Sequence, residues 1–358
     1  APLSPSGGPV DRRNSPAARP ADVTVLGRGA GPAAQARAAY GALSARLTDP
    51  HNALLTEFVT VAALDAHQEL AAVRAAHFPD AADSARTVVV ESLPDPDALL
   101  AVRAGYRTAA GDGTVRLPTV LPVDDHGDVA HPDDFPTQYA YCLRKAGRLL
   151  KSAGLSLDHA VTTFDYTTPA TRRAYPSCSG PRRELLGGAG VFPGAGGILM
   201  SRLHAPGILV ALDVTASRHP LSSVNPGWGR YDTLTYSPGV LAGRTLYMSG
   251  FAALDMETQQ ALHQGDVVAQ TETVLRAVLE VVAAAGGGPE HLVSVEEYLC
   301  PPAVADRAAV TAARTRILGA ASRPAVTSVG CATLLRREFL TELFPTAVLP
   351  APAEEGTR

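Results

Sequence analysis

Hydrophobic and polar positions form a complete series of helix and strand patterns between residues 265 and 350. A polar start at Gly265 and Asp266 precedes apolar residues at helical spacing, and this helix ends at glycines 286–288. A strand (292–299), a second helix (about 303–318) and two further strands (325–334 and 339–348) follow. Periodicity and breaking residues together predict one compact α+β unit.

Two upstream segments show the same order of elements. The middle of the chain predicts a helix over 138–153 and strands over 160–166, 198–203 and 207–215, with a glycine run at 194–197. The N-terminal part predicts helices over 33–47 and 65–78 and strands over 54–64, 87–92 and 98–104. A sheet with one apolar face must be covered by helices. The chain therefore predicts three tandem units of mixed sheets with helices on one face, at 21–106, 107–220 and 221–350.

Length, composition and charge limit the kinds of protein and partner that fit this chain. The 358 residues, 46% of them hydrophobic, can bury a large core. The proline-rich residues 1–20 and residues 351–358 are typical of mobile tails without a catalytic role. A net charge of −4 without a basic stripe argues against a nucleic-acid partner. No apolar stretch reaches the length of a membrane span and the N-terminus lacks an apolar signal core, so we expect a cytoplasmic protein without membrane contact.

Neither the cysteines nor the acidic segments predict a metal site. The four cysteines stand far apart without metal-binding spacing, and reduced thiols are expected at Cys142, Cys178, Cys300 and Cys331. A hard-metal loop needs glycine and ligands at fixed offsets, which the acidic, histidine-containing run at 124–134 does not show, so this run predicts a solvated loop. We expect no metal and no other cofactor.

Of the final strands of the three units, one carries a carboxylate among its apolar residues. The third unit carries Glu342 between apolar residues, whereas the corresponding segments 208–212 and 99–102 are apolar throughout. A glutamate in a strand built for burial has a raised pKa unless it is paired, which suits a general acid or base. The alternative is a glutamate on an edge strand facing solvent, because alternation alone does not decide which face is covered.

Several cationic and aromatic residues are candidates for substrate binding. Arginines that could hold a carboxylate are Arg314 in the second helix of the third unit, Arg182 and Arg183 after Gly180-Pro181, and Arg202 near the end of the second unit. Helical arginines are more often solvated. The aromatic residues Trp228, Tyr231, Tyr236 and Tyr247 could line a pocket for a flat ring, or they could simply pack between strands.

The third unit resembles the Rid (YjgF) superfamily of reactive-intermediate deaminases. The matching segments are 246–250, 265–271, 284–286, 323–325 and 339–343. Proteins of that superfamily are trimers with active sites between subunits. The resemblance therefore implies an α+β fold of tandem Rid/chorismate-mutase-like units that form an intramolecular pseudo-trimer.

The fused layout is similar to that of chorismatases, which act on chorismate in secondary metabolism. The segments that carry this likeness are Tyr175 with Arg182 and Arg183, glycines 194–197, the link 219–236 and the strand of Glu342. The likeness implies that Glu342 is catalytic and that Arg314 lies near a substrate-binding arginine. Two departures from these families argue against their known activities in this chain. Val326 replaces the arginine with which Rid deaminases bind the substrate carboxylate, and Asn225 to Trp228 replace a Tyr-Gly-Pro-Arg-like stretch of chorismatases.

The sequence thus predicts a cofactor-independent enzyme of natural-product biosynthesis that uses Glu342 for acid/base catalysis on a small molecule. Ring closure with aromatisation, a cyclase activity, is favoured because the link departs from the chorismatase pattern while Glu342 remains. The alternatives are a chorismatase-type hydrolase or lyase, a non-catalytic binding protein and a residual imine deaminase. A monomer or a weak dimer is expected.

Overall fold

The computed structural model describes residues 23–106, 113–320 and 322–350. The predicted tails, 1–20 and 351–358, lie outside these residues. None of the helices in the described ranges has the length and apolar character needed to cross a membrane.

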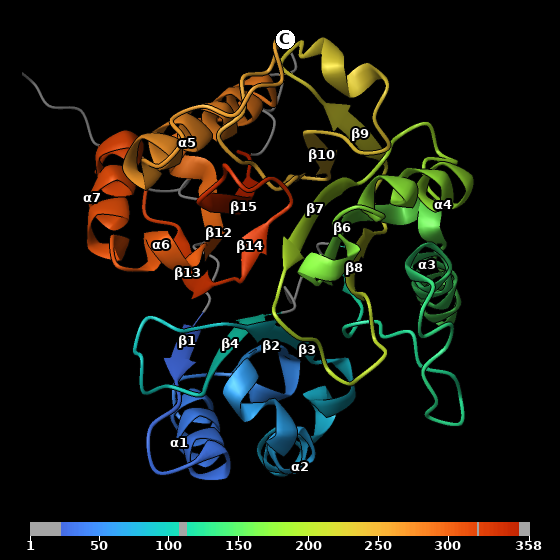
Figure 1. Ribbon diagram of the computed structural model, residues 1–358, viewed down its shortest axis with the longest axis vertical. Coiled ribbons are helices and arrows are strands. Elements are labelled where there is room, and N and C mark those ends of the chain that lie inside the picture. The colour runs from blue at the N-terminus through green and yellow to red at the C-terminus, as the bar shows by residue number, and fades with distance from the viewer. Residues whose placement is uncertain (1–22, 107–112, 321, 351–358) are drawn as a thin grey trace, which may run out of the picture.

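Three sheets repeat one strand order (Figure 1). The first sheet contains β1 (Val23–Leu26), β2 (Ala53–Thr60), β3 (Arg86–Val90) and β4 (Leu100–Tyr106). The second contains β5 (Thr114–Arg116), β6 (Ala160–Thr167), β7 (Gly194–Leu199) and β8 (Ala211–Ser217). The third contains β9 (Leu221–Val224), β10 (Gly239–Ala242), β11 (Thr245–Met248), β12 (Leu292–Leu299), β13 (Ala325–Gly330) and β15 (Thr341–Val348). In each sheet the central strand pairs in parallel with one neighbour and antiparallel with the last strand of its unit.

Helices cover the outer face of each sheet, and the sheets face the centre of the molecule (Figure 1). The helices are α1 (Pro32–Ser44), α2 (His67–His77), α3 (Phe135–Ser152), α4 (Ser179–Leu185), α5 (Val267–Ala284), α6 (Pro301–Val304) and α7 (Arg307–Leu318). The long helices α3 and α5 begin at equivalent caps, because Asp134 accepts a hydrogen bond from the Thr137 amide and Asp266 from the Ala269 amide.

Residues from all three sheets meet in one apolar cluster at the centre of the molecule. Phe58 on β2, Tyr166 on β6 and Tyr298 on β12 occupy corresponding places in it, and all three are buried. Burial of this inner face stabilises the arrangement of the units, while each outer face is buried under its own helices. The predicted α+β fold of tandem units, with helices on one face of each sheet, is confirmed.

The structure differs from the expected elements where two units touch. The strand expected over 325–334 is two strands, and the second, β14 (Thr333–Leu334), pairs with β7 of the second sheet. The glycine run expected to precede a strand is itself the first part of β7, since Gly194 to Gly197 pair in register with β6. Strand propensity misses this segment because glycine is disfavoured in strands unless another group must approach closely.

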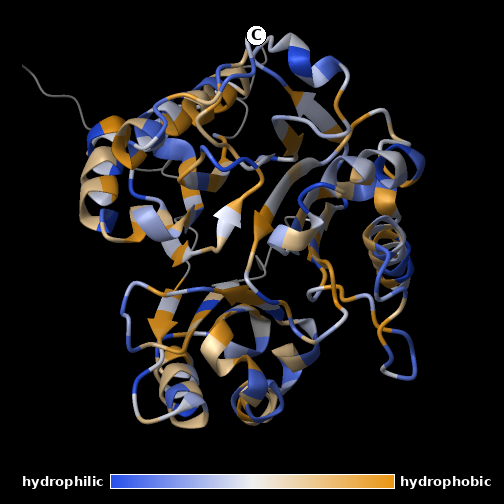
Figure 2. Cartoon of the chain, in the orientation of Figure 1, coloured by the Kyte–Doolittle hydropathy of each residue, from blue (hydrophilic) through white to orange (hydrophobic). Residues whose placement is uncertain are grey.

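The acidic run at 124–134 lies in the segment between β5 and α3, which projects from the molecule and is hydrophilic at its tip (Figure 2). Within the described ranges, no group of three or more His, Cys, Asp or Glu side chains is placed to hold a metal ion. All four cysteines are free and buried.

Candidate active site between the second and third units

Glu342 lies on the inner face of the third sheet. Its strand, β15, runs between β12 and β11, and Glu342 stands directly opposite Tyr298. Opposite residues of an antiparallel pair point to the same face, so the carboxyl shares the interior with Tyr298. Glu342 is 8% exposed, which rules out the alternative of a solvent-facing glutamate on an edge strand. The same register position is Ala101 in the first unit and Ala211 in the second.

Burial, followed by the charges of Asp165 and Cys300, raises the pKa of Glu342 to about 8. No hydrogen bond or ion pair from any residue in the described part of the chain reaches this carboxyl. Desolvation disfavours the charged form when no partner compensates it. At neutral pH, Glu342 is therefore a protonated, unpaired acid.

Three glycines make room for the side chains around Glu342. A Cβ built on Gly250 would overlap Glu342 Oε1 and would lie 2.8 Å from Phe344 Cε1. A Cβ on Gly196 would overlap the Phe344 ring, and one on Gly197 would overlap the Tyr175 hydroxyl. Glycine is required at these places for close approach rather than for an unusual φ.

Backbone and side-chain hydrogen bonds join the second and third units beside these glycines. The Gly250 amide donates to the Ala195 carbonyl over 2.9 Å, and the Ala195 amide donates to Ser249 Oγ over 2.9 Å. The strand β7 is thereby fixed against the turn that follows β11. Backbone atoms of the two units therefore meet beside Glu342.

Asp165 is a second buried carboxyl near Glu342, and the sequence analysis missed it. It lies on β6 opposite Gly197 and is 1% exposed. Burial raises its pKa to about 7, although a hydrogen bond with Tyr175 and the charge of Arg182 act in the opposite direction. Its Oδ2 atom has no hydrogen-bond partner among the described residues. The charge of Asp165 is among the causes that raise the pKa of Glu342, because two like charges near each other are unfavourable.

The predicted arginines Arg182 and Arg314 occupy one repeated position. In every unit a buried acid precedes the interior aromatic residue of the central strand, and an arginine follows 17 residues later on a covering helix. The pairs are Glu57 with Arg74, Asp165 with Arg182, and Glu297 with Arg314. Since alternate residues of a strand point to opposite faces, these acids face the helices rather than the interior.

Both arginines donate hydrogen bonds within the protein. Arg314 donates to Glu297 over 2.6 Å. Arg182 donates to Thr163 Oγ1 over 2.6 Å, to the Tyr139 hydroxyl over 3.0 Å and to the Thr235 carbonyl over 2.9 Å. Their described contacts hold helix against sheet.

The other two predicted arginines are exposed. Arg183 lies on the outer side of α4. Arg202 pairs with Asp65 of the first unit over 2.6 Å, with the Arg202 side chain 41% exposed and the Asp65 side chain largely in solvent. Neither contacts Glu342 in the described chain.

The predicted aromatic residues of the link gather beside Glu342. Ring centroids are 5.9 Å apart for Trp228 and Tyr231 and 5.6 Å apart for Tyr231 and Tyr236. The charge of Glu342 is among the causes that raise the pKa of both tyrosines, after burial. Tyr247 lies apart from this group, and its hydroxyl is hydrogen bonded to Thr114 of β5.

Arg230 brings a cation into the same aromatic group, and the sequence analysis did not single it out. Its guanidinium lies 5.4 Å from the centre of the Tyr231 ring and donates to the Tyr236 hydroxyl over 3.3 Å. The side chain is half-buried. No carboxylate of the described residues pairs with it, so most of its donors are available to a ligand.

Comparisons with known proteins agree with this architecture. Residues 231–349 match the family model of endoribonuclease L-PSP, the Rid type. A chorismatase crystal structure is similar over 92% of this chain and 98% of that chain, with 14% identity and a TM-score of 0.55. A protein of unknown function from Pseudomonas aeruginosa is 29% identical over 36% of this chain and 93% of that chain, with a TM-score of 0.32. A Rid-family protein from Yersinia pestis is 20% identical over 36% of this chain and 100% of that chain, also with a TM-score of 0.32. The chain is thus chorismatase-like in fold, with a Rid-type third unit.

Proposed function

We propose that this chorismatase-like chain is a cofactor-independent enzyme in which Glu342 acts as a general acid on a small, unsaturated, carboxylated ring compound. The observation that carries the proposal is the state of Glu342: a buried, unpaired carboxyl whose pKa of about 8 keeps it protonated at neutral pH. A proton donor is most effective when its pKa lies near the working pH.

The chemistry suited to this acid begins with protonation of an electron-rich double bond. A proton added to an enol ether or a diene produces a cation, which water can attack or which loses another proton to form an aromatic ring. Apolar and aromatic side chains around Glu342, including Phe344 and Tyr298, limit access of water to the step. Where Asp165 is ionised, its charge disfavours ionisation of Glu342 and helps to keep the proton there until the substrate takes it.

Arg230 gives the substrate its second attachment point. A guanidinium binds a carboxylate through two parallel hydrogen bonds. Tyr231 and Tyr236 lie beside it and offer faces on which a planar ring can pack. The site therefore pairs an anion anchor with an acid, across a surface that fits a flat ring.

This arrangement favours a chorismatase-type reaction over the cyclase that the sequence suggested. Both reactions would use Glu342 in the same way. A cyclase acting on a neutral, carbonyl-rich chain has no use for the cation of Arg230, whereas chorismate carries carboxylates. Val326 stands at the position where Rid deaminases have their arginine. It lies on β13 among apolar residues under the helices, so this position offers no cation for an imine deaminase.

The test is incubation of the purified protein with chorismate, with products followed by chromatography and mass spectrometry. We expect turnover in the wild type, a fall in kcat of about 10²-fold or more in Glu342→Gln, and a raised KM in Arg230→Gln. Arg183→Gln, an exposed arginine on α4, is the matched control and should behave as the wild type.

Full activity of Glu342→Gln would overturn the proposal. If chorismate is not consumed, carbonyl-rich aromatic precursors are tested in the same way. Turnover of those precursors that depends on Glu342 but not on Arg230 would reject the carboxylated substrate and establish the cyclase. Ammonia release from 2-iminopropionate, measured in parallel, would instead establish the deaminase.

A further inference from the structure

Equivalent inner-face positions of the three units have diverged into different contacts. In each unit, one residue of the last strand stands opposite the central-strand residue that lies two positions before the interior aromatic residue. These pairs are Arg103 opposite Thr56, Asp213 opposite Phe164, and Phe344 opposite Glu296. Each meets a neighbouring unit. Arg103 pairs with Glu296, Asp213 lies 3.9 Å from Arg86, and the rings of Phe344 and Phe164 are 4.5 Å apart.

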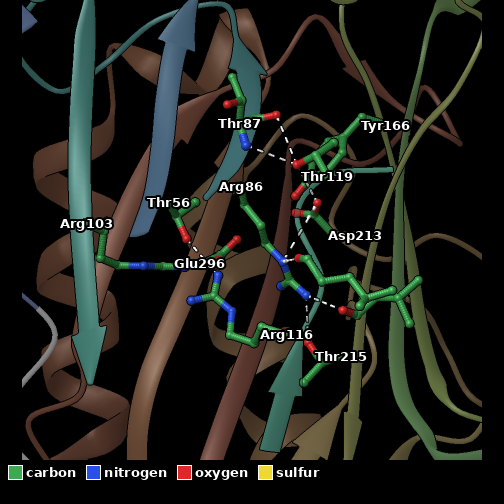
Figure 3. Close-up of polar contacts among 12 residues, drawn as sticks. Thr56, Arg86, Thr87, Arg103, Arg116, Thr119, Tyr166, Asp213, Thr215 and Glu296 are labelled. Atoms are coloured by element: carbon green, nitrogen blue, oxygen red, sulfur yellow. Dashed lines mark hydrogen bonds and ion pairs between the residues drawn. The ribbon is translucent and has the colours of Figure 1, made fainter. Parts of the chain in front are cut away.

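A third arginine joins the two charged contacts of the first unit. Arg116 on β5 points toward Glu296 and lies close to Arg86 and Arg103 (Figure 3). Within the described ranges, three guanidinium groups of this cluster therefore face two carboxylates, Asp213 and Glu296. Burial, followed by the charges of Arg86 and Arg103, lowers the pKa of Arg116 to about 9.

The three arginines differ in how many of their donors are used. Arg86 donates to the Leu117 carbonyl over 3.0 Å and to the Val214 carbonyl over 2.5 Å, so its position is fixed by backbone. Arg116 has five N–H donors, yet its hydrogen bond with a described residue is the one to Thr56 Oγ1, over 2.8 Å. Arg116 has intermediate exposure, whereas Arg86 and Arg103 are buried.

An uncompensated cation in such surroundings is unfavourable unless a ligand or water completes its hydrogen bonds. An oxyanion would supply both the missing charge and acceptors in the geometry that guanidinium prefers. Thr56 and Thr215 stand beside the arginines and add hydroxyl groups to the surroundings (Figure 3).

The arginine cluster lies apart from the proposed catalytic acid. Glu342 stands opposite Tyr298, whereas the cluster belongs to the level of Glu296, two residues earlier on β12 and about 7 Å along the strand. The hydroxyls of Tyr166 and Tyr298 are 3.2 Å apart, and the Tyr298 hydroxyl donates to Glu296 over 3.3 Å at the edge of the cluster. Glu342 faces the junction of the second and third units, and the arginines lie where the first unit meets the other two.

We propose that Arg116, together with Arg86 and Arg103, binds a compact oxyanion, a carboxylate or a phosphoryl group, at the junction of the three units. Such a ligand would bridge the units through charge, independently of the reaction at Glu342.

The test is titration of the full-length protein with phosphate or with malonate, against chloride at equal ionic strength, by calorimetry and thermal unfolding. We expect one site per chain, and a rise in Tm of roughly 3 °C or more at a hundredfold excess over Kd. Binding of phosphate alone assigns a phosphoryl group, and binding of malonate alone assigns a carboxylate.

Arg116→Gln should weaken binding at least tenfold, and in chloride its Tm should exceed that of the wild type because an uncompensated charge is removed. Arg116→Lys keeps the charge without the planar fork and should bind with intermediate affinity, while Arg183→Gln should match the wild type. The proposal is overturned if neither anion binds the wild type, if the Arg116 variants bind equally well, or if the anion competes with the substrate of Glu342. The wild-type titration decides the matter even if a variant does not fold.

Discussion

The Glu342 carboxyl rests against the backbone of Gly250, at a place where any Cβ would overlap its Oε1 atom. Phe344, two residues further along β15, approaches the same point, since its Cε1 would lie 2.8 Å from that Cβ. One glycine thus sets the position of both an acid and an aromatic ring. The position of the acid depends on a residue that has no side chain.

Gly250→Ala should displace Glu342 without removing it. Because small misplacements of reacting groups are costly, we expect kcat to fall by about 10²-fold. The forced adjustment of Phe344 should lower the free energy of unfolding by about 1–3 kcal/mol. Steady-state kinetics and urea denaturation measure the two effects.

The matched control is Gly180→Ala, at a position on α4 where an added Cβ meets nothing within 4 Å. Alanine there should leave kcat unchanged and should not reduce stability. A Gly250→Ala enzyme with wild-type kcat would show that the acid does not need its present position.

Stability should depend on pH through Glu342. Its folded pKa, about 8, lies above the unfolded value near 4.5, so the folded state binds the extra proton. Stability is therefore fully present below the unfolded pKa and is lost as the pH rises toward the folded pKa. The loss for this group amounts to at most about 5 kcal/mol.

Glu342→Gln lacks this ionisation and should become more stable relative to the wild type as the pH is raised from 5 to about 9. Asp165 titrates in both proteins, so most of its own contribution cancels in the difference between their stability curves. Urea denaturation at several pH values provides the curves. Parallel curves would mean that Glu342 is already ionised at neutral pH.

Arg314→Met should lower stability rather than substrate affinity. Its partner Glu297 has no exposed side-chain surface, so loss of the guanidinium leaves a buried carboxylate without its ion pair. We expect a loss of about 3–5 kcal/mol in the free energy of unfolding, with little change in KM.

Arg316, two residues along α7, provides the comparison. It pairs with Glu272 at the surface, where an ion pair contributes at most about 1 kcal/mol. Arg316→Met should therefore be nearly neutral. A raised KM with unchanged stability in Arg314→Met would restore Arg314 to the substrate site that the sequence analysis gave it.

Much of the fold is readable from the sequence because each unit repeats its own local patterns. The strand Leu292–Leu299 coincides with its prediction, and α5 begins at the Asp266 cap that the polar start indicated. The break between β13 and β14 could not be read in this way. The partner of Thr333 is Leu199 of another unit, and pairing across units leaves no periodic signal in either segment.

The site was only partly readable. Glu342 stood out because its two register equivalents are alanines. Asp165 was overlooked although its pattern, an acid before an aromatic residue on the central strand, occurs in all three units. The common spacing of 17 residues between this acid and an arginine is visible in the sequence itself and indicates a structural pair.

The sequence around Arg230 contains no comparable pattern. It lies in an irregular segment between β9 and β10, and its place beside Tyr231 and Tyr236 depends on how that segment folds. Local sequence does not specify such long-range contacts.

The divergence of Arg103, Asp213 and Phe344 has a consequence for how such an enzyme can change. In a trimer of identical chains, every substitution appears three times by symmetry, and a residue that suits one interface must suit all of them. Fusion in one chain removes that constraint. One junction keeps a protonated glutamate over glycine, while the other two carry opposite charges that match only one order of neighbours. Three copies of one fold thereby carry different residues at equivalent positions, and of the three register equivalents Ala101, Ala211 and Glu342 one is a carboxylic acid.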